Sequence, residues 1–196
     1  MAGKKVKIVD KWKSKKWYSV KAPSLFESKE ICELVAADEA KLINRVVKAS
    51  LMELGVSGSQ MAMFTALRFR IKEVNGNDAN TTLLGHEISP SFIRTFARRG
   101  RSLIHQVVDG KTKDNEELRL KIIAVTGSRV SMNTKKNLRA LVVEEAKSAI
   151  VDKNFDEVIQ DVIYGRVSSK IFSRLKQITK MKRVEIRRSE RGEEFK

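Results

Sequence analysis

The chain has 196 residues, 41% of them hydrophobic, and its 40 lysines and arginines outnumber 24 acidic residues for a net charge of +16. This hydrophobic content is too high for a disordered chain, and no apolar run approaches the roughly 20 residues of a membrane span. The basic start lacks the apolar segment of a signal peptide. The single cysteine, Cys32, excludes an intrachain disulfide framework and a cysteine-rich zinc site. We expect a cytosolic protein with one domain, or one domain and a small appendage.

The positive charge is concentrated in three segments. Residues 1–21 hold eight lysines and one acid, residues 91–101 hold four arginines and no acid, and residues 166–196 hold 11 basic and four acidic residues. The segments between them are close to neutral. A self-repelling excess of this kind predicts a polyanionic partner, with nucleic acid as the first candidate and an anionic membrane surface as the second.

The first 16 residues are rich in lysine and have little apolar content to bury. We predict that they form a flexible arm that becomes ordered on a partner. Trp12 and Trp17 stand out in this region, and each ring can either pack on the domain or stack on an unpaired base. Packing is the preferred interpretation for Trp17, which adjoins Tyr18 and Val20. For Trp12 the two interpretations carry equal weight.

Several strands joined by short turns are predicted between residues 31 and 88. They are residues 31–35, 42–54, 60–74 and 81–88, with a loop at 55–59 and a tight turn at Asn75-Gly76. Such a series is typical of a mostly antiparallel sheet, curled or closed into a barrel.

Strict alternation of apolar and basic residues marks the stretch from residue 67 to residue 72. As a strand, it places three apolar side chains in the core and turns Arg68, Arg70 and Lys72 outward. Residues 118–122 repeat the alternation. A basic face on one strand can serve solubility alone, but its recurrence favours a function in binding phosphates.

A short helix over residues 90–99 is predicted by Ser89 as N-cap, Pro90 at the first helical position and Gly100 as C-terminal cap. Its polar side carries the basic residues Arg94, Arg98, Arg99 and Arg101. Basic residues also stabilise the C-terminal end of a helix. Four arginines without an acid exceed that need, which favours contact with RNA.

The remaining sequence alternates between strand and helix patterns. Strands are predicted at 103–108 and 118–125, with Asp109-Gly110 starting the turn between them. Beyond residue 127 the spacing is helical, with a capping box at Asn154 and Glu157 and a further apolar stripe from 167 to 178. Strand alternation returns at residues 183–187.

No motif for catalysis is recognisable. The sequence lacks the glycine-rich phosphate loop, the dinucleotide-binding fingerprint and the zinc-protease motif. His86 and Glu87 are adjacent in a predicted strand, so their side chains point to opposite faces and do not form an acid–base pair. We predict no enzymatic activity, no cofactor and no metal site, and we expect Cys32 to be a small core residue.

The predicted partner is one structured RNA, because phosphate contacts position a protein without reading base sequence and no RNA-recognition motif or GXXG loop is present. A membrane-surface protein is the second hypothesis, with residues 167–180 as its amphipathic helix. An enzyme acting on RNA is the third. The residues expected at the RNA surface are Lys11, Trp12, Lys13, Lys15, Lys16, Arg68, Arg70, Arg94, Arg98, Arg99, Arg101, Arg129, Lys135, Lys136, Arg139, Lys170, Arg174, Lys180, Lys182, Arg183, Arg187 and Arg188.

A set of short stretches keeps one order from about residue 10 to residue 188. They are Asp10-Lys11-Trp12, Lys16-Trp17-Tyr18, Lys21-Ala22-Pro23, Leu42-Ile43-Asn44-Arg45-Val46, Gly85-His86-Glu87-Ile88-Ser89, Thr112-Lys113-Asp114, Leu118-Arg119 and Arg183-Val184-Glu185-Ile186-Arg187. Together they resemble the archaeal and eukaryotic small-subunit ribosomal protein family S-three-Ae, also classed as the eukaryotic-type S-one. The chain departs from the family pattern at Asn44, Lys48, Glu53 and Asn115.

The resemblance implies a barrel-like β domain on the platform of the small subunit. It implies binding to small-subunit rRNA near its 3′ end and the mRNA exit, beside neighbouring ribosomal proteins, with mRNA as a further candidate partner and no membrane.

We therefore predict an α+β fold with a mostly antiparallel barrel-like sheet, a C-terminal group of helices and a basic N-terminal arm. Its parts are the arm 1–16, a barrel-like core 17–126 containing the helix 90–99, a mainly helical part 127–188 that returns to a strand near 183–187, and a charged tail 189–196.

Overall fold

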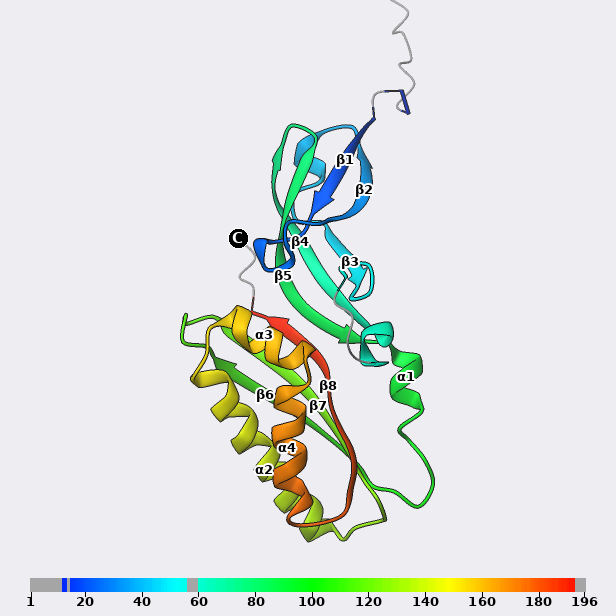
Figure 1. The fold of residues 1–196 in the computed structure, drawn as a ribbon, viewed down its shortest axis with the longest axis vertical. Helices are drawn as coiled ribbons and strands as arrows, with labels where there is room; N and C mark the ends of the chain where they lie inside the picture. The colour runs from blue at the N-terminus through cyan, green and yellow to red at the C-terminus, as the bar shows by residue number, and fades with distance from the viewer. Residues whose placement is uncertain (1–11, 14, 56–59, 193–196) are drawn as a thin grey trace, which may run out of the picture. The chain divides into compact units, whose positions relative to one another are not determined.

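A computed structural model describes residues 12, 13, 15–55 and 60–192 (Figure 1). The strands in this part of the chain are β1 (Lys16–Lys21), β2 (Glu30–Ala36), β3 (Val46–Ser50), β4 (Thr65–Asn75), β5 (Asp78–Ile88), β6 (Leu103–Lys111), β7 (Glu117–Thr126) and β8 (Met181–Arg191). The helices are α1 (Pro90–Arg94), α2 (Met132–Val151), α3 (Phe155–Ile163) and α4 (Arg166–Lys176), with short 3-10 helices η1 (Ser24–Phe26), η2 (Glu39–Lys41) and η3 (Gln60–Phe64).

The strands of the described residues form one open sheet. Its order is β2-β1-β5-β8-β7-β6, with β4 joined to β5 and β3 joined to β4. The pairs β1–β2, β5–β8, β6–β7 and β7–β8 are antiparallel, whereas β1 and β5 are parallel. The α+β class and the mostly antiparallel sheet are therefore confirmed. The sheet does not close into a barrel, because β2 and β6 end the order and are not paired with each other.

The contacts divide the chain into two units that are interleaved along the sequence. Unit 1 comprises Met1–Val47 and Phe69–Leu83, and unit 2 comprises Lys48–Arg68 and Leu84–Lys196. The long strands β4 and β5 each contribute residues to both units. The turn between these two strands follows Asn75, with Gly76 at φ 63°, and this confirms the tight turn predicted at Asn75-Gly76.

Unit 1 is built around a core in which Tyr18, Val20, Leu42 and Ile71 are buried, with Cys32 packed against it. Because Tyr18 and Val20 point inward, the alternation of β1 turns Trp17 outward, where 64% of its surface is exposed. The preferred interpretation of Trp17 as a packed residue is therefore wrong.

The single strand predicted over residues 42–54 is interrupted at its start. Asn44 adopts φ 68°, a left-handed conformation that a strand does not accommodate. Its amide donates to the Ile71 carbonyl at 3.0 Å, and the Ile71 amide donates to the Arg45 carbonyl at 3.0 Å. Only Val46–Ser50 form the strand. The predicted strand 60–74 is likewise shorter than expected, since η3 precedes β4.

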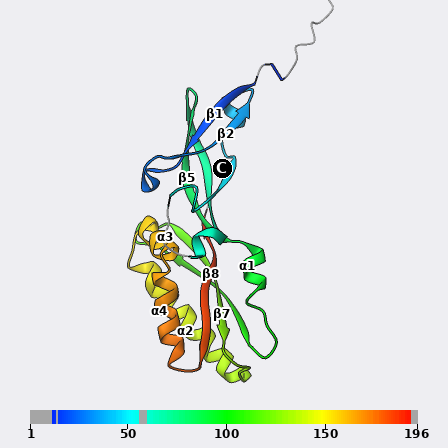
Figure 2. The same cartoon turned by 45° about the vertical axis from the view of Figure 1, so that its right-hand side comes forward.

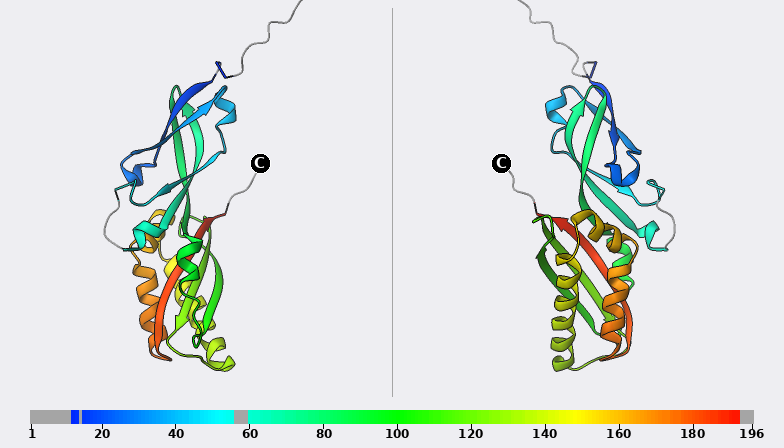
Figure 3. Two further views of the ribbon diagram at one scale, coloured as in Figure 1. Left: turned by 90° about the vertical axis from the view of Figure 1, so that its right-hand side faces the viewer. Right: turned by 60° about the vertical axis from the view of Figure 1, so that its left-hand side comes forward.

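Unit 2 has helices on both faces of its strands, but unequally. Helices α2, α3 and α4 cover one face of β6, β7 and β8, and the short α1 lies on the other side (Figures 2 and 3). The buried residues of α2 are Leu138, Val142, Ala146 and Ile150. Their spacing of four residues places them in one row along the helix that faces the sheet.

Residues Asp109-Gly110 lie inside β6 and do not start a turn as predicted. A side chain at Gly110 would place its Cβ 3.1 Å from the Ile150 side chain, so glycine allows α2 to pack closely on β6. The turn instead spans residues 112–116, where the Thr112 amide donates to the Glu116 carbonyl at 3.0 Å.

Helix α1 is only five residues long, so the predicted helix 90–99 with Gly100 as its cap is wrong beyond Arg94. The Thr95 hydroxyl donates to the Phe92 carbonyl at 2.6 Å and the Thr95 amide donates to the same carbonyl at 3.1 Å. A side-chain hydroxyl that competes for a helix carbonyl favours termination. Pro90 does occupy the first turn, as predicted.

Two further expectations concern the C-terminal part. The capping box at Asn154 and Glu157 is confirmed, with the Asn154 amide donating to the Glu157 carboxylate at 3.3 Å. The strand at 183–187 is also confirmed, but β8 continues to Arg191. Residues 189–191 therefore belong to the sheet and not to a tail.

Candidate nucleic-acid interface

One face of the unit 2 sheet carries a row of charged side chains. In β7, Leu118, Leu120 and Ile122 are buried, and the period of two turns Arg119 and Lys121 to the opposite face. The strand register then decides their neighbours: Arg119 lies between Asp109 of β6 and Glu190 of β8, and Lys121 lies between Val107 and Arg188.

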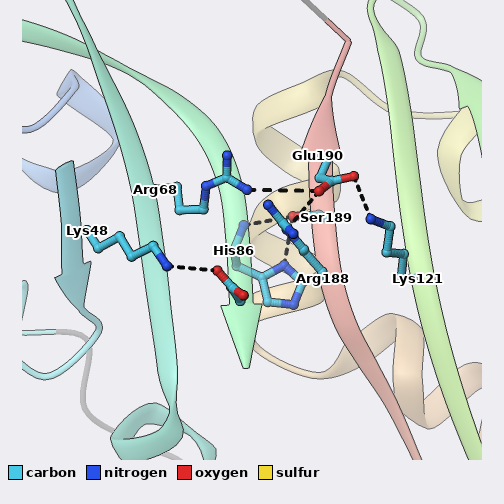
Figure 4. Close-up of polar contacts among 8 residues, drawn as sticks. Lys48, Arg68, His86, Lys121, Arg188, Ser189 and Glu190 are labelled. Carbon is cyan, nitrogen blue, oxygen red and sulfur yellow. Dashed lines mark hydrogen bonds and ion pairs between the residues drawn. The ribbon is translucent and has the colours of Figure 1, made fainter. Parts of the chain in front are cut away.

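Glu190 is the centre of an ion cluster on this face (Figure 4). Its carboxylate lies 2.9 Å from the Lys121 ammonium, 2.8 Å from Arg188 Nε and 3.9 Å from Arg68 Nη1. Burial by itself raises the pKa of Glu190, but the Lys121 hydrogen bond and the charges of Arg188 and Arg68 outweigh it, and the pKa is lowered. Three cations around one carboxylate leave this part of the sheet positive.

A neutral histidine of β5 forms hydrogen bonds with β8 beneath the charged face. His86 Nε2 lies 2.8 Å from the Ile186 carbonyl and Nδ1 lies 2.7 Å from the Ser189 hydroxyl. Because a carbonyl only accepts, the proton is on Nε2, and Nδ1 accepts from Ser189. Burial lowers the pKa of His86 to about 4, although the Ile186 carbonyl and Glu87 oppose the shift. The imidazole is therefore a structural group, which agrees with the prediction that His86 and Glu87 form no acid–base pair.

The two strands approach closely at this point. A Cβ on Gly85, whose φ is +145°, would lie 2.1 Å from the Ser189 carbonyl oxygen. Glu87, which follows His86 in β5, forms an ion pair with Lys48 of β3 at 3.2 Å. The charged row thus extends from β6 across β7, β8 and β5 to β3.

The segment from α1 to residue 101 presents the arginines that the sequence predicted. Arg94, Arg98 and Arg99 are exposed and form no ion pair with any residue that the structure describes, while Arg101 is half-buried. Phe92 and Phe96 anchor the segment, since they pack against Ile123 and Val125 of β7 and against each other with ring centroids 5.0 Å apart. Free guanidinium groups are therefore held on a well-packed base.

Arg183 joins the same cluster from β8. Its guanidinium lies 5.5 Å from the centroid of the Phe92 ring and 5.2 Å from that of Phe96. It also lies 3.7 Å from Glu185, a carboxyl whose pKa is raised by burial despite the opposing charge of Arg183. Contact with two rings fixes the plane of the guanidinium, so that its far side can meet a phosphate or the face of a base.

The predicted basic residues of α2 and α4 differ in how far they are already engaged. Lys170 and Arg174 of α4 both lie 3.5 Å from Glu145 of α2 and therefore hold two helices together. Other basic residues of unit 2 form no ion pair with a described residue; these are Arg129, Lys135, Lys136, Arg139, Lys180, Lys182 and Arg187.

The predicted residues of unit 1 are mostly exposed. Trp12 is 67% exposed and the Lys15 ammonium lies 3.9 Å from the centroid of its ring. Lys13 and Lys16 are also exposed. Arg70 of β4 belongs to this unit and is half-buried. Lys11 lies outside the described residues.

The described residues contain no group of three or more histidine, cysteine or acidic side chains that could hold a metal ion. None of their helices is long and apolar enough to cross a membrane. The apolar stripe of α4, formed by Val167, Ile171 and Leu175, is buried in unit 2, so the amphipathic helix of the membrane-surface hypothesis has no apolar face left to insert.

Comparison with known proteins identifies the family. A family model described as the ribosomal S3Ae family matches residues 3–193. The chain belongs to this family. Among S3Ae relatives, a protein of Methanobrevibacter smithii named small ribosomal subunit protein eS1 is 37% identical over 93% of this chain and 94% of its own length. Proteins of the same name from Staphylothermus marinus and Methanothermobacter thermautotrophicus are 35% and 33% identical, over 96% and 93% of this chain and 88% and 93% of their own lengths. The resemblance inferred from the short stretches is confirmed.

In this S3Ae chain the sequence-based prediction missed part of the charged row. Lys121 lies in the recurring alternation of residues 118–122 but is not among the residues predicted to contact RNA. No sequence pattern marks Lys48 or Glu190 as part of a binding surface. Their roles depend on the register of β7, β8 and β5, which pairs residues that are far apart in the sequence.

Proposed function

We propose that this chain is a structural constituent of the small ribosomal subunit and binds small-subunit rRNA through phosphate-neutralising lysines and arginines. Membership of the S3Ae family and the names of the relatives support the ribosomal role. The observation that carries RNA binding is the set of exposed arginines Arg94, Arg98 and Arg99, which have no ion pair among the described residues and stand on an aromatic base.

The arrangement suits a polyanion with a fixed shape. Exposed cations that lack an internal partner gain most when they meet phosphates, because each contact releases condensed counterions. Side chains held by ion pairs and ring contacts, such as Arg183 and Arg188, lose less rotamer freedom on binding than mobile ones do. Free charges then supply affinity and the fixed ones supply geometry.

The finer location follows the family resemblance. We place the chain on the platform of the cytoplasmic ribosome, near the 3′ end of the rRNA and the mRNA exit, beside neighbouring small-subunit proteins. The proposed contacts are the basic residues predicted from the sequence, other than Lys182, together with Lys48 and Lys121 from the charged row. No step of this function requires catalysis, a cofactor or a metal ion.

The test is a salt series that compares two double variants. Arg94→Ala with Arg98→Ala removes two exposed arginines that form no ion pair with a described residue. The control, Arg119→Ala with Arg166→Ala, removes two arginines that already face Asp109 and Asp161. Affinity for small-subunit rRNA is measured from 50 to 300 mM KCl by filter binding, with an unrelated structured RNA of equal length beside it.

We expect the first pair to weaken binding to the cognate RNA and to reduce the slope of log K against log salt by about 1.4 to 1.8, since each phosphate contact contributes about 0.7 to 0.9. The control pair should change the slope by less than half of that. If the two double variants have equal slopes, Arg94 and Arg98 do not contact phosphate. If the wild type shows no preference for the cognate RNA, the positive charge acts only as a generic polycation.

A further inference from the structure

A groove of about 400 Å³ lies beside β8 in unit 2. Its walls include Val162 and Tyr164 at the end of α3, Phe172 of α4 and Val184 of β8. Ser169 and Ser173 of α4 line it as well and are exposed. The groove is therefore partly apolar, with hydroxyl groups along one side, and it differs in character from the charged row.

The groove exists because β5 leaves the sheet early. The residue pairing of β5 with β8 is confined to Glu87 and Arg188. After Ile88 the chain turns away at Ser89 and enters α1 at Pro90, a residue that has no amide hydrogen to donate. From residue 182 to residue 186, β8 has β7 on one side and no described strand on the other.

The side of β8 that faces the groove offers backbone hydrogen-bonding groups. The Ile186 carbonyl accepts from His86, so the polar groups of Ile186 point away from β7. With a period of two, the amide and the carbonyl of Val184 point the same way. Outside the ladder with β7, no hydrogen bond of either group of Val184 is found among the residues that the structure describes. A free donor and acceptor on a strand edge are a template for an added strand.

The charged side chains that line the groove include Lys182, Arg183 and Glu185, and the last two form an ion pair with each other at 3.7 Å. The exposed Lys182 lies at its rim and forms no ion pair with a described residue. Glu185 lines the groove too, and a carboxylate beside an outward carbonyl repels phosphate. The backbone of an extended peptide can hydrogen-bond to both the amide and the carbonyl of Val184 without bringing a phosphate near Glu185. An acidic side chain on this peptide would pair with Lys182.

We propose that this groove receives an extended segment of a neighbouring small-subunit protein, which adds to β8 as a short strand and places an acidic residue near Lys182. The proposal goes beyond rRNA binding and does not depend on the exposed arginines. It also assigns Lys182, expected from the sequence to contact RNA, to a protein contact.

The experiment uses assembled subunits. A photo-crosslinking amino acid replaces Ser169 in the chain, and small subunits are purified from cells that carry this chain. After irradiation the crosslinked product is identified by mass spectrometry. Lys147, exposed on α2 away from the groove residues, is the control position. We expect Ser169 to crosslink to one segment of one other small-subunit protein, with at least fivefold higher yield than Lys147.

Two blocking variants make the test specific. Val184→Pro removes the amide that faces the groove while leaving the bonds to β7, and Ser173→Trp fills the groove without touching the strand. Each should lower the Ser169 crosslink at least fivefold in subunits that still contain the chain. Crosslinking mainly to rRNA would overturn the proposal, as would equal yields at Ser169 and Lys147. If either variant that enters subunits at the normal level retains the full crosslink, the added strand is also refuted.

Discussion

Acidification should weaken unit 2 through His86. The pKa of this buried imidazole is lowered from 6.5 to about 4 by burial. The unfolded chain therefore binds a proton between these two values that the folded chain does not bind. The resulting stabilisation is fully present above pH 6.5 and is lost as the pH falls towards 4. One pH unit of pKa difference is worth about 1.4 kcal/mol, so the whole loss is about 3 kcal/mol.

The loss between pH 7 and pH 5 can be measured directly. The difference between the folded and unfolded pKa values lowers the free energy of unfolding by about 2 kcal/mol over this interval. With a urea dependence of about 2 kcal/mol/M, the urea midpoint falls by about 1 M. Urea titrations followed by circular dichroism at both pH values, at constant ionic strength, provide the midpoints. His86→Gln is the matched variant, because an amide can still donate to the Ile186 carbonyl and does not titrate.

We expect the variant to be less stable than the wild type at pH 7 and to lose less free energy of unfolding between pH 7 and pH 5. The pKa of His105 is also lowered, by burial and by the charge of Arg187, and this histidine titrates in both proteins. Carboxyl groups such as Glu190, whose pKa is lowered in the folded chain, contribute equally to both proteins. If the wild type and His86→Gln lose the same free energy of unfolding between pH 7 and pH 5, the neutral buried imidazole is not the source of the effect. The hydrogen-bond assignment to Ile186 would then be wrong.

Two further predictions concern packing and are checked by the same urea titrations. Gly85→Ala should lower the free energy of unfolding by about 3 kcal/mol, because its Cβ would lie 2.1 Å from the Ser189 carbonyl oxygen. Gly100→Ala, with positive φ but open space around it, should lower it by only about 1 kcal/mol. Equal losses would mean that the backbone conformation alone decides the effect. Ile150→Ala should lower the free energy of unfolding by about 2 to 5 kcal/mol, because the Ile150 side chain is fully buried. Val151 is 58% exposed, so Val151→Ala should change the free energy of unfolding by no more than about 0.5 kcal/mol. A loss below 1 kcal/mol at Ile150 would contradict the packing of α2 on the sheet.

Much of the fold could be predicted because local patterns act over short distances. The alternation of residues 118–122 gave a strand, and the capping box at Asn154 gave the start of a helix, since each depends on neighbours within a few residues. The lengths of elements were less predictable. Thr95 ends α1 through its own hydroxyl, and Gly110 continues β6 because Ile150 packs over it. Both outcomes are decided by contacts that the local pattern does not contain.

The candidate site was predictable in kind but not in detail. Unbalanced positive charge identified the segment around Arg94 and Arg98 correctly as exposed. It could not distinguish these arginines from Arg188, which looks equally basic in the sequence but faces Glu190 in the sheet. The groove beside β8 gave no sequence signal at all, because it results from a strand that leaves the sheet early.

The position of β8 in the sheet has a consequence for how the chain is made. This strand lies between β5 and β7, yet it follows every other described strand in the sequence. Since synthesis proceeds from the N-terminus, unit 2 lacks a central strand until residue 191 has left the exit tunnel of the translating ribosome. A chain that stops near residue 180 would keep α2, α3, α4 and the pairing of β6 with β7, but one edge of β7 and the His86 side chain would lack their partners in β8. Incomplete chains would therefore expose open strand edges to chaperones and proteases, and only full translation would yield a unit that can enter a subunit.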